Sequence, residues 1–162
     1  MKDSSAASGS SDISRPSVGF IGLGNVGGKL AGSLLRNGFD LVVRDLDQAA
    51  AQPFMDGGAR WASSGRELAE QVDVVITCLP SPAASAAVME ADDGVLAGFS
   101  AVSSEGKIWA EMSTTDEAEV KRLVPLVEAV NASAVDCPVS GGCHRAATGN
   151  IAIFAGCDRE VF

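Results

Sequence analysis

Residues 17–45 read SVGFIGLGNVGGKLAGSLLRNGFDLVVRD, and this stretch decides the fold. The apolar run at its start ends in three closely spaced glycines, Gly22, Gly24 and Gly27. A helical pattern over residues 25–36 follows, with Gly38 as a stop signal, and a second apolar run leads to Asp45. Glycines at this spacing, between a strand and a helix, are typical of a turn that binds a dinucleotide.

Each glycine has a physical reason to be there. Gly22 permits the sharp turn after a buried strand, Gly24 lets the backbone approach a pyrophosphate, and Gly27 lets the helix pack close to the sheet. The first backbone N–H groups of the helix and its dipole then favour an anion. Asp45 lies close to the roughly 20-residue offset of an acid that binds the adenosine ribose. The alternative is a glycine-rich turn that serves packing alone.

Composition limits the other function classes. The chain has 162 residues, enough for one domain, with 46% hydrophobic and 20% charged residues, as in globular proteins. None of its apolar runs reaches the roughly 18 residues that suggest a membrane span. A formal charge of −9 without a Lys/Arg cluster disfavours nucleic acid. We expect a cytoplasmic protein without a nucleic-acid or membrane partner.

The cysteines show no spacing that suggests a metal site. They are Cys78, Cys137, Cys143 and Cys157. The single histidine, His144, is adjacent to one of them, and no second pair completes a tetrahedral zinc site. We therefore expect free thiols in a reducing compartment and no bound metal.

Apolar β-rich runs alternate with helical patterns, which predicts a Rossmann-type α/β fold, a doubly wound and mainly parallel sheet in a single domain. The expected strands are Val18–Gly22, Leu41–Arg44, Val72–Cys78, Lys107–Met112, Ala134–Cys137 and Ile151–Ala155. The expected helices after the first are Gln48–Asp56, Gly65–Gln71, Pro82–Glu90 and Thr115–Val130, with Ser64 and Ser113 or Thr114 as N-caps.

Two other segments carry weaker patterns. Residues 1–16 are rich in Ser, Ala and Gly, so we expect a flexible tail before a dinucleotide-binding domain over residues 17–162. Ala91–Gly106 contains three glycines and is expected to be a surface connection.

Several blocks beyond the glycine turn point to one family. They are GFIGLGNVG at 19–27, VVITCLP at 74–80, EMSTT at 111–115, DCPVSGG at 136–142 and IAIFAG at 151–156. In this order the chain resembles the N-terminal, cofactor-binding domain of the β-hydroxyacid dehydrogenases, which include 3-hydroxyisobutyrate dehydrogenase. That domain is related to the NADP-binding domain of 6-phosphogluconate dehydrogenase.

The resemblance implies two groups of site residues. The first lines the cofactor: Leu23, Gly24, Asn25 and Val26 at the pyrophosphate turn, Leu79 and Pro80 on the adenosine or ribose side, and Thr114 near the nicotinamide ribose. The second forms the loop for the substrate carboxylate: Ser140, Gly141 and Gly142. Successive glycines after a strand can also gather backbone N–H groups into an anion-binding nest, although an ordinary glycine turn is the alternative.

The charge at residue 45 favours NAD over NADP. Asp45 can accept hydrogen bonds from a ribose diol, whereas a 2′-phosphate about 4 Å away would meet a repulsion on the order of 4 kcal/mol before salt screening. Arg44 is the opposing feature, because it could turn toward a phosphate. The wider family includes many NADP users with Asn-Arg-Thr or Asn-Arg-Ser here, whereas this chain has Asp-Leu-Asp at residues 45–47 and lacks that arginine. We expect NAD, with NADP possible.

The family's general acid/base is a lysine in an all-helical C-terminal domain, and this sequence stops at Phe162, before that motif. The chain's own lysines, Lys2, Lys29, Lys107 and Lys121, lack those surroundings and are expected to be solvated. No catalytic residue is therefore assigned. His144 with Arg145 could hold an anionic substrate, although an exposed loop histidine is the better reading.

The resemblance therefore implies the cofactor domain of an oxidoreductase that takes hydride from a short 3-hydroxy acid. With the helical domain absent, we expect poor activity alone, and a homo-oligomer only where that domain is present. A non-catalytic dinucleotide-binding module and a truncated gene product are the alternatives.

Overall fold

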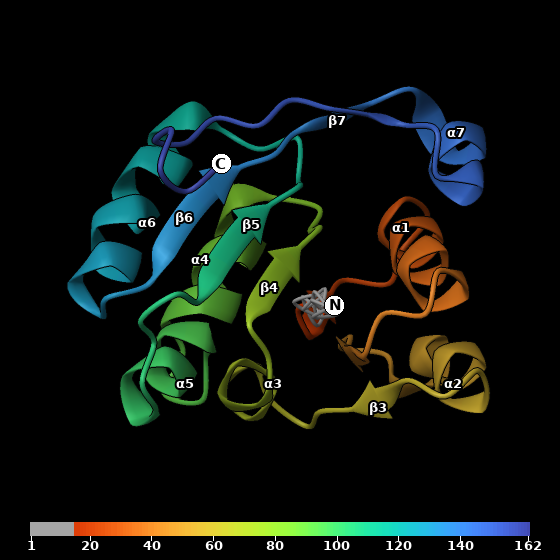
Figure 1. The fold of residues 1–162 in the computed structure, drawn as a ribbon, viewed down its shortest axis with the longest axis horizontal. Helices are drawn as coiled ribbons and strands as arrows, with labels where there is room; N and C mark the ends of the chain where they lie inside the picture. The colour runs from red at the N-terminus through yellow and green to blue at the C-terminus, as the bar shows by residue number, and fades with distance from the viewer. Residues whose placement is uncertain (1–14) are drawn as a thin grey trace, which may run out of the picture.

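A computed structural model describes residues 15–162 (Figure 1). The tail expected over residues 1–16 lies outside the described residues, except for its last two positions. The strands are β1 Val18–Ile21, β2 Leu41–Arg44, β3 Arg60–Trp61, β4 Val74–Thr77, β5 Ile108–Glu111, β6 Ser133–Asp136, β7 Val139–Ser140 and β8 Ala152–Ile153. The helices are α1 Gly27–Arg36, α2 Gln48–Asp56, α3 Gly65–Gln71, α4 Pro82–Glu90, α5 Val95–Ala101, α6 Glu117–Ala129 and α7 Gly142–Thr148.

Six strands form one parallel sheet in the order β3-β2-β1-β4-β5-β6. The chain starts in the middle, winds outward to β3, returns to β4 and winds outward again. The strand order therefore reverses between β1 and β4. This is the doubly wound topology that the sequence predicts, and ligands of such sheets bind beyond the carboxyl ends of the strands at the reversal.

Helices cover both faces of the sheet, as Figure 1 shows. One core joins α3, α4, α5 and α6 to strand residues such as Val42, Val75 and Trp109. The other joins α1, α2 and α7 to the alternate residues, among them Val43 and Ile76. Because successive side chains of a strand point to opposite faces, continuous apolar runs suit strands that are buried on both sides.

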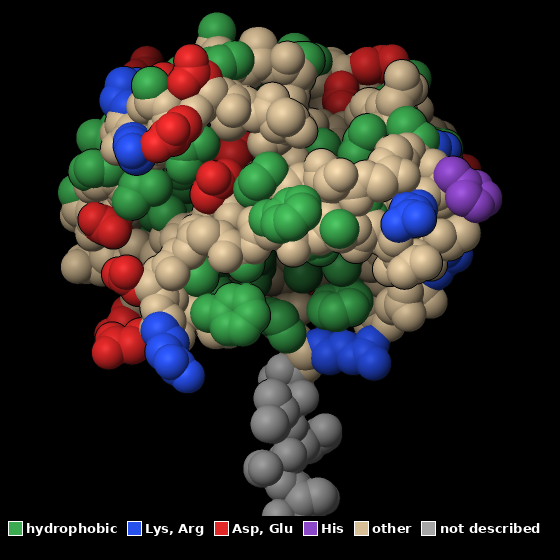
Figure 2. All heavy atoms as spheres, turned by 90° about the horizontal axis from the view of Figure 1, so that it is seen from above, with side chains coloured by type: hydrophobic (Ala, Val, Ile, Leu, Met, Phe, Trp, Pro, Cys, Tyr) green, Lys and Arg blue, Asp and Glu red, His purple; other side chains and the backbone are tan. Residues whose placement is uncertain are grey.

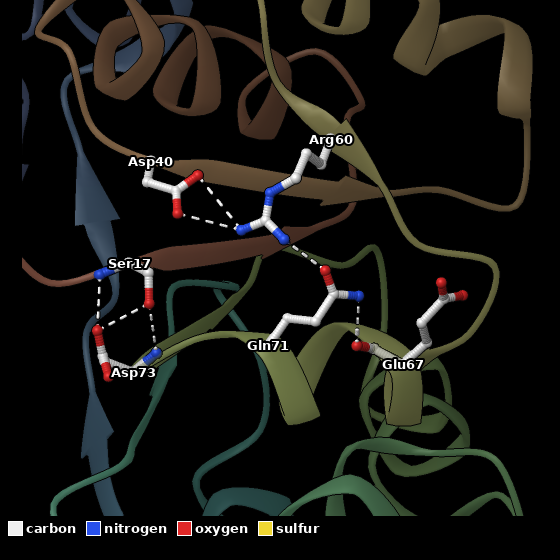
Figure 3. Close-up of polar contacts among 6 residues, drawn as sticks. All are labelled: Ser17, Asp40, Arg60, Glu67, Gln71 and Asp73. Carbon is white, nitrogen blue, oxygen red and sulfur yellow. Dashed lines mark hydrogen bonds and ion pairs between the residues drawn. The ribbon is translucent and has the colours of Figure 1, made fainter.

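Polar contacts hold the amino ends of the strands together (Figure 3). Asp73, just before β4, accepts hydrogen bonds at Oδ2 from the backbone N–H (2.8 Å) and the hydroxyl (2.7 Å) of Ser17, just before β1. These bonds lower the pKa of the Asp73 carboxyl below its ordinary value of 3.8. On β3, Arg60 pairs with Asp40 at 3.1 Å and donates a hydrogen bond to Gln71 of α3. These contacts lie at the end of the sheet opposite to the carboxyl ends of the strands, where ligands of such sheets bind.

One strand prediction is wrong, and the two-residue strands β3 and β7 are not among the predicted strands. The sequence pattern contains no sign of β3, because two residues are too few to show a period. The apolar run Ile151–Ala155 was expected in the main sheet, but β8 pairs antiparallel with β7 in a separate two-stranded sheet. The chain reverses after β6 through β7 and α7, so the run returns antiparallel, and only Gly156 after it forms a bridge with Asp136 of β6.

The expected surface connection Ala91–Gly106 is also wrong, because it contains α5. Val95, Gly98 and Phe99 are buried there at helical spacing. Gly94 is the N-cap, and a Cβ on Gly98 would lie 2.5 Å from the carbonyl oxygen of Arg66 in α3. Two of the glycines taken as breakers therefore begin the helix and let it pack closely.

Of the two predicted helix N-caps, one is confirmed and the other is wrong. Ser64 is confirmed as the N-cap of α3, since its Oγ accepts a hydrogen bond from the N–H of Glu67 at 3.0 Å. The predicted cap at Ser113 or Thr114 is wrong, because Asp116 caps α6 by accepting from the N–H of Ala118 at 2.8 Å. A carboxylate adjacent to the first helical turn thus replaces the hydroxyl, and Ser113 takes part in another network.

Candidate functional site

The glycine turn after β1 has the shape that the sequence predicts. Gly22 has φ +99°, and a Cβ there would lie 2.3 Å from the carbonyl oxygen of Cys78. A Cβ on Gly27 would lie 2.0 Å from the carbonyl oxygen of Gly22. Gly24 differs, because it is exposed and a Cβ there would meet nothing within 4 Å. Two glycines therefore permit the turn, while the third keeps open space above it.

A cleft of about 770 Å³ opens over this turn, at the carboxyl ends of β1, β2, β4 and β5. Its volume is in the range of small-molecule and cofactor pockets. Figure 2 shows the molecule from above, the side toward which β4, β5 and β6 point in Figure 1. Hydrophobic side chains gather over the middle of this face, and most Lys and Arg side chains lie toward its edge.

The cleft brings together most of the residues predicted to bind the cofactor. Those that line it are Gly22, Gly24, Asn25, Val26, Gly27, Arg44, Asp45, Leu79, Pro80 and Thr114. Leu23 differs, because its side chain is buried in the core around α1 and only its backbone N–H takes part, as a donor to Asp45. Of the predicted substrate loop, Gly142 lines the cleft, while Ser140 and Gly141 are exposed beside it.

Asp45 is tied to the glycine turn. Its Oδ2 accepts a hydrogen bond from the N–H of Leu23 at 2.6 Å, and its Oδ1 accepts one from the N–H of Asp47 at 3.0 Å. A carboxylate oxygen has two lone pairs, so each oxygen keeps one acceptor position free. The same group can therefore hold the turn and accept hydrogen bonds from a ribose diol.

The side chain of Arg44, the last residue of β2, is hydrogen-bonded to the connection between β3 and α3. Its Nη1 donates a hydrogen bond to the carbonyl oxygen of Ser63 at 2.5 Å. Hydrogen bonds from Ser63, with a smaller effect of the Arg44 charge, lower the pKa of Glu67. The guanidinium thus faces the β3–α3 connection and has an anionic neighbour there.

One wall of the cleft is apolar and was missed by the sequence analysis. Ala84, Ala87, Val88 and Ala91 line it from α4 and its C-cap. Their spacing of three, four and seven residues is that of one helix face, and this periodicity was the available signal. Leu46, which is 97% exposed, lines the cleft from the end of β2. Small side chains and an exposed leucine in one cleft suit a flat, apolar ring.

The remaining wall rests on a buried carboxylate, Glu111, at the end of β5. Its Oε2 accepts a hydrogen bond from the hydroxyl of Ser85 at 2.9 Å, and its Oε1 accepts from the N–H of Ser113 at 2.8 Å and from the Ser113 hydroxyl. Ser113 Oγ in turn accepts from the N–H of Leu79 at 2.7 Å. Burial, with a smaller effect of Glu111, raises the pKa of the nearby Cys78 thiol to about 11.

Other predicted features lie outside the cleft. His144 is exposed on α7 and does not line it, and neither do Lys29, Lys107 or Lys121. Within residues 15–162, no three His, Cys, Asp or Glu side chains gather where they could hold a metal ion. None of the helices in that range is long and apolar enough to cross a membrane.

The comparisons agree with this geometry. The family described as the NAD binding domain of 6-phosphogluconate dehydrogenase matches residues 17–162. The mitochondrial 3-hydroxyisobutyrate dehydrogenase of Mus musculus is 35% identical over 149 residues, which cover 92% of this chain and 43% of that protein. The chain therefore spans less than half the length of the curated relatives it matches.

Solved structures give the same result. The Mycobacterium tuberculosis 3-hydroxyisobutyrate dehydrogenase, in a structure with L-serine, superposes with a TM-score of 0.79 at 27% identity, over 90% of this chain and 48% of that one. A structure described as Psf3 in complex with NADP⁺ and 2-OPP has a TM-score of 0.81 at 27% identity, over 88% and 49% of the two chains.

Proposed function

Because the chain belongs to the family of NAD binding domains of 6-phosphogluconate dehydrogenase, we propose that it forms the cofactor-binding part of an oxidoreductase acting on the CH–OH group of a short 3-hydroxy acid. One observation carries the proposal. The turn around Gly24 opens, beside Asp45, into a cleft at the reversal of strand order. Backbone N–H groups, an acid and a cleft stand together where a dinucleotide needs all three.

The chain's own residues would bind and orient the cofactor. The turn at residues 22–27 would hold the pyrophosphate, and Asp45 would bind the adenosine ribose. Leu79 and Pro80 would contact the adenosine or ribose side, and Thr114 would lie near the nicotinamide ribose. The nicotinamide, when bound, supplies the acceptor for a hydride from the alcohol carbon. The apolar wall of α4 would exclude water from part of the site.

We propose a preference for NAD over NADP. Asp45 would repel a 2′-phosphate, and its backbone hydrogen bonds hold it in place. Arg44, the one basic residue among the described residues that line the cleft, donates to Ser63 and lies near the Glu67 carboxylate. A phosphate would have to displace both contacts. The NADP⁺ complex of the related Psf3 structure makes the preference worth measuring.

The substrate carboxylate would bind at Ser140, Gly141 and Gly142. Gly141 and Gly142 have φ of +132° and +74°, so this turn favours glycine at both positions, and successive backbone N–H groups in a turn can bind an anion. Gly142 lines the cleft that Gly24 also lines. The loop therefore stands at the same cavity as the cofactor turn.

We propose that the chain turns substrate over poorly by itself. Among the described residues, the cleft lining contains neither a lysine nor a histidine. General acid/base catalysis contributes typically 10²–10⁴-fold, and the family's lysine has no counterpart in this lining. A rate with 3-hydroxy acids far below the usual roughly 1–10³ per second is expected from residues 1–162 alone.

The experiment is a calorimetric titration of the purified chain with NADH and with NADPH. We expect NADH to bind at least tenfold more tightly, because a phosphate beside Asp45 meets a like charge. Asp45→Asn should narrow that ratio toward one, while Asp56→Asn, at an exposed acid at the end of α2, leaves it unchanged. A folded chain that binds neither coenzyme would refute the proposal.

A further inference from the structure

Glu111 is a carboxylate in a position where burial is energetically unfavourable for a charged group. It is fully buried at the carboxyl end of β5, beside Thr77 of β4 and Asp136 of β6. Taking a charged group out of water is costly unless hydrogen bonds compensate. Three donors do so, two from Ser113 and one from Ser85. None of the three belongs to the regular ladder of the sheet, so the group is not required for strand pairing.

The donors come from segments that line the cleft or support it. Ser113 and Thr114 follow β5, and both line the cleft. Ser113 also accepts the N–H of Leu79, so the turn between β4 and α4 is fixed to the same carboxylate at one end. Ser85, in the first turn and a half of α4, fixes the other end of that turn. One side chain therefore sets the position of two loops and of a helix relative to one another.

We propose that Glu111 is a positioning residue for the nicotinamide half of the cofactor, acting through Ser113 on the adjacent Thr114, the residue expected near the nicotinamide ribose. The inference rests on the cofactor site proposed above and deepens it. In a doubly wound sheet each half binds one mononucleotide. Glu111 belongs to the half formed by β4, β5 and β6, whereas the glycine turn and Asp45 belong to the other half.

The location of Glu111 predicts that its substitution weakens the binding of NADH more than the binding of ADP. Glu111→Gln keeps the volume but removes the charge and replaces one acceptor oxygen by a donor, so the hydrogen bonds to the serines are weakened or reversed in direction. We expect Glu111→Gln to weaken NADH binding about tenfold and to change ADP binding less than twofold, because ADP occupies only the first half. A purely structural defect would weaken both ligands alike, or neither. The matched control is Glu117→Gln, an exposed acid on α6 that pairs with Lys121.

A double-mutant cycle tests the route through Ser113. If Glu111 acts by holding that hydroxyl, Ser113→Ala should reproduce the loss of NADH affinity, and the double variant should lose little more than either single one. Ser85→Ala, which leaves Glu111 and Ser113 in place, should show a smaller loss. Circular dichroism and thermal unfolding establish that each variant is folded. Should Glu111→Gln fail to fold, Ser113→Ala and Ser85→Ala carry the comparison of NADH with ADP.

The outcomes separate this inference from the proposed function. A wild-type chain that binds neither NADH nor ADP would overturn the cofactor site and this inference with it. Wild-type binding of both, with folded variants that keep NADH affinity within twofold, would overturn the role of Glu111 alone. So would equal losses for NADH and ADP. A loss confined to NADH that is shared by Glu111→Gln and Ser113→Ala supports it.

Discussion

Gly24 and Gly27 are three residues apart, yet their surroundings make opposite demands on a side chain. At Gly27 a methyl group would meet the backbone oxygen of Gly22, which the turn cannot move. At Gly24 the methyl group would meet nothing in the protein and would project into the space that a pyrophosphate needs. One glycine therefore serves the fold, and the other keeps a surface accessible.

Alanine at each position should separate stability from binding. Gly27→Ala is expected to lower the free energy of unfolding by about 1–3 kcal/mol through overpacking. Gly24→Ala should change it by less than about 0.5 kcal/mol, as at other exposed sites, while weakening NADH binding at least tenfold. Urea unfolding and NADH titration of both variants measure the two quantities. Equal losses of unfolding free energy in the two variants would contradict the absence of protein contacts for a methyl group at Gly24.

At the residue scale, the sequence was sufficient where the spacing of residues determines chemistry. The glycines and Asp45 could be placed because their offsets are set by a strand, a turn and a helix of ordinary length. Glu111 could not be placed as a buried group, because a single carboxylate after an apolar strand looks the same whether it meets water or serines. Its partner Ser113 is only two residues away, but Ser85 is brought to it by the packing of α4 against the sheet.

The contact between Ser17 and Asp73 fixes the start of β1 against the start of β4, the two strands between which the order reverses. Because the folded pKa of Asp73 is lowered, its contribution to stability is present above pH 3.8 and is lost as pH falls through the folded pKa. Acid should therefore loosen the centre of the sheet at its amino ends.

Asp73→Asn tests this contribution. The variant should lose about 1 kcal/mol of unfolding free energy at pH 7, since hydrogen bonds to a charged acceptor are replaced by weaker ones. Below pH 4 the difference from the wild-type chain should shrink, because the wild-type carboxyl becomes protonated there. Urea unfolding from pH 7 to pH 2.5 measures it, with Asp92→Asn as an exposed control. A difference that stays constant with pH would contradict the assignment.

The elements could be predicted where they are long or strongly apolar. Five of the six expected strands lie in the parallel sheet, because each is a largely apolar run between turn signals. α5 was missed because the apolar spacing of Val95, Gly98 and Phe99 was outweighed by the neighbouring glycines. The close approach to α3 that makes glycine useful at position 98 is a tertiary fact, which local propensity cannot reveal.

At the scale of the whole molecule, the cleft is bordered by both halves of the sheet, so a bound dinucleotide would link them. Ligand that binds only the folded state adds about 2.7 kcal/mol of stability at 100 times its Kd. For a domain of this size we expect NADH at that concentration to raise the Tm by roughly 5–10 °C.

Calorimetric scans with and without NADH measure this shift. Gly24→Ala should show at most about half of it at the same NADH concentration, because a Kd raised tenfold or more leaves about 1.4 kcal/mol or less of stabilisation. A shift of equal size in that variant would place the binding of NADH elsewhere on the molecule.

The segment after β6 has a consequence for biosynthesis. Val139, Gly142 and Ile151 border the same cleft as Gly22 and Gly24, and α7 contacts α1 through a hydrogen bond from Arg36 to the carbonyl oxygen of Ala147 at 2.6 Å. The ribosome therefore releases the first part of this pocket early and its final part more than a hundred residues later. The pocket therefore remains incomplete during most of translation. The coenzyme can contact all sides of the pocket only after the residues up to Ile151 have emerged from the ribosome.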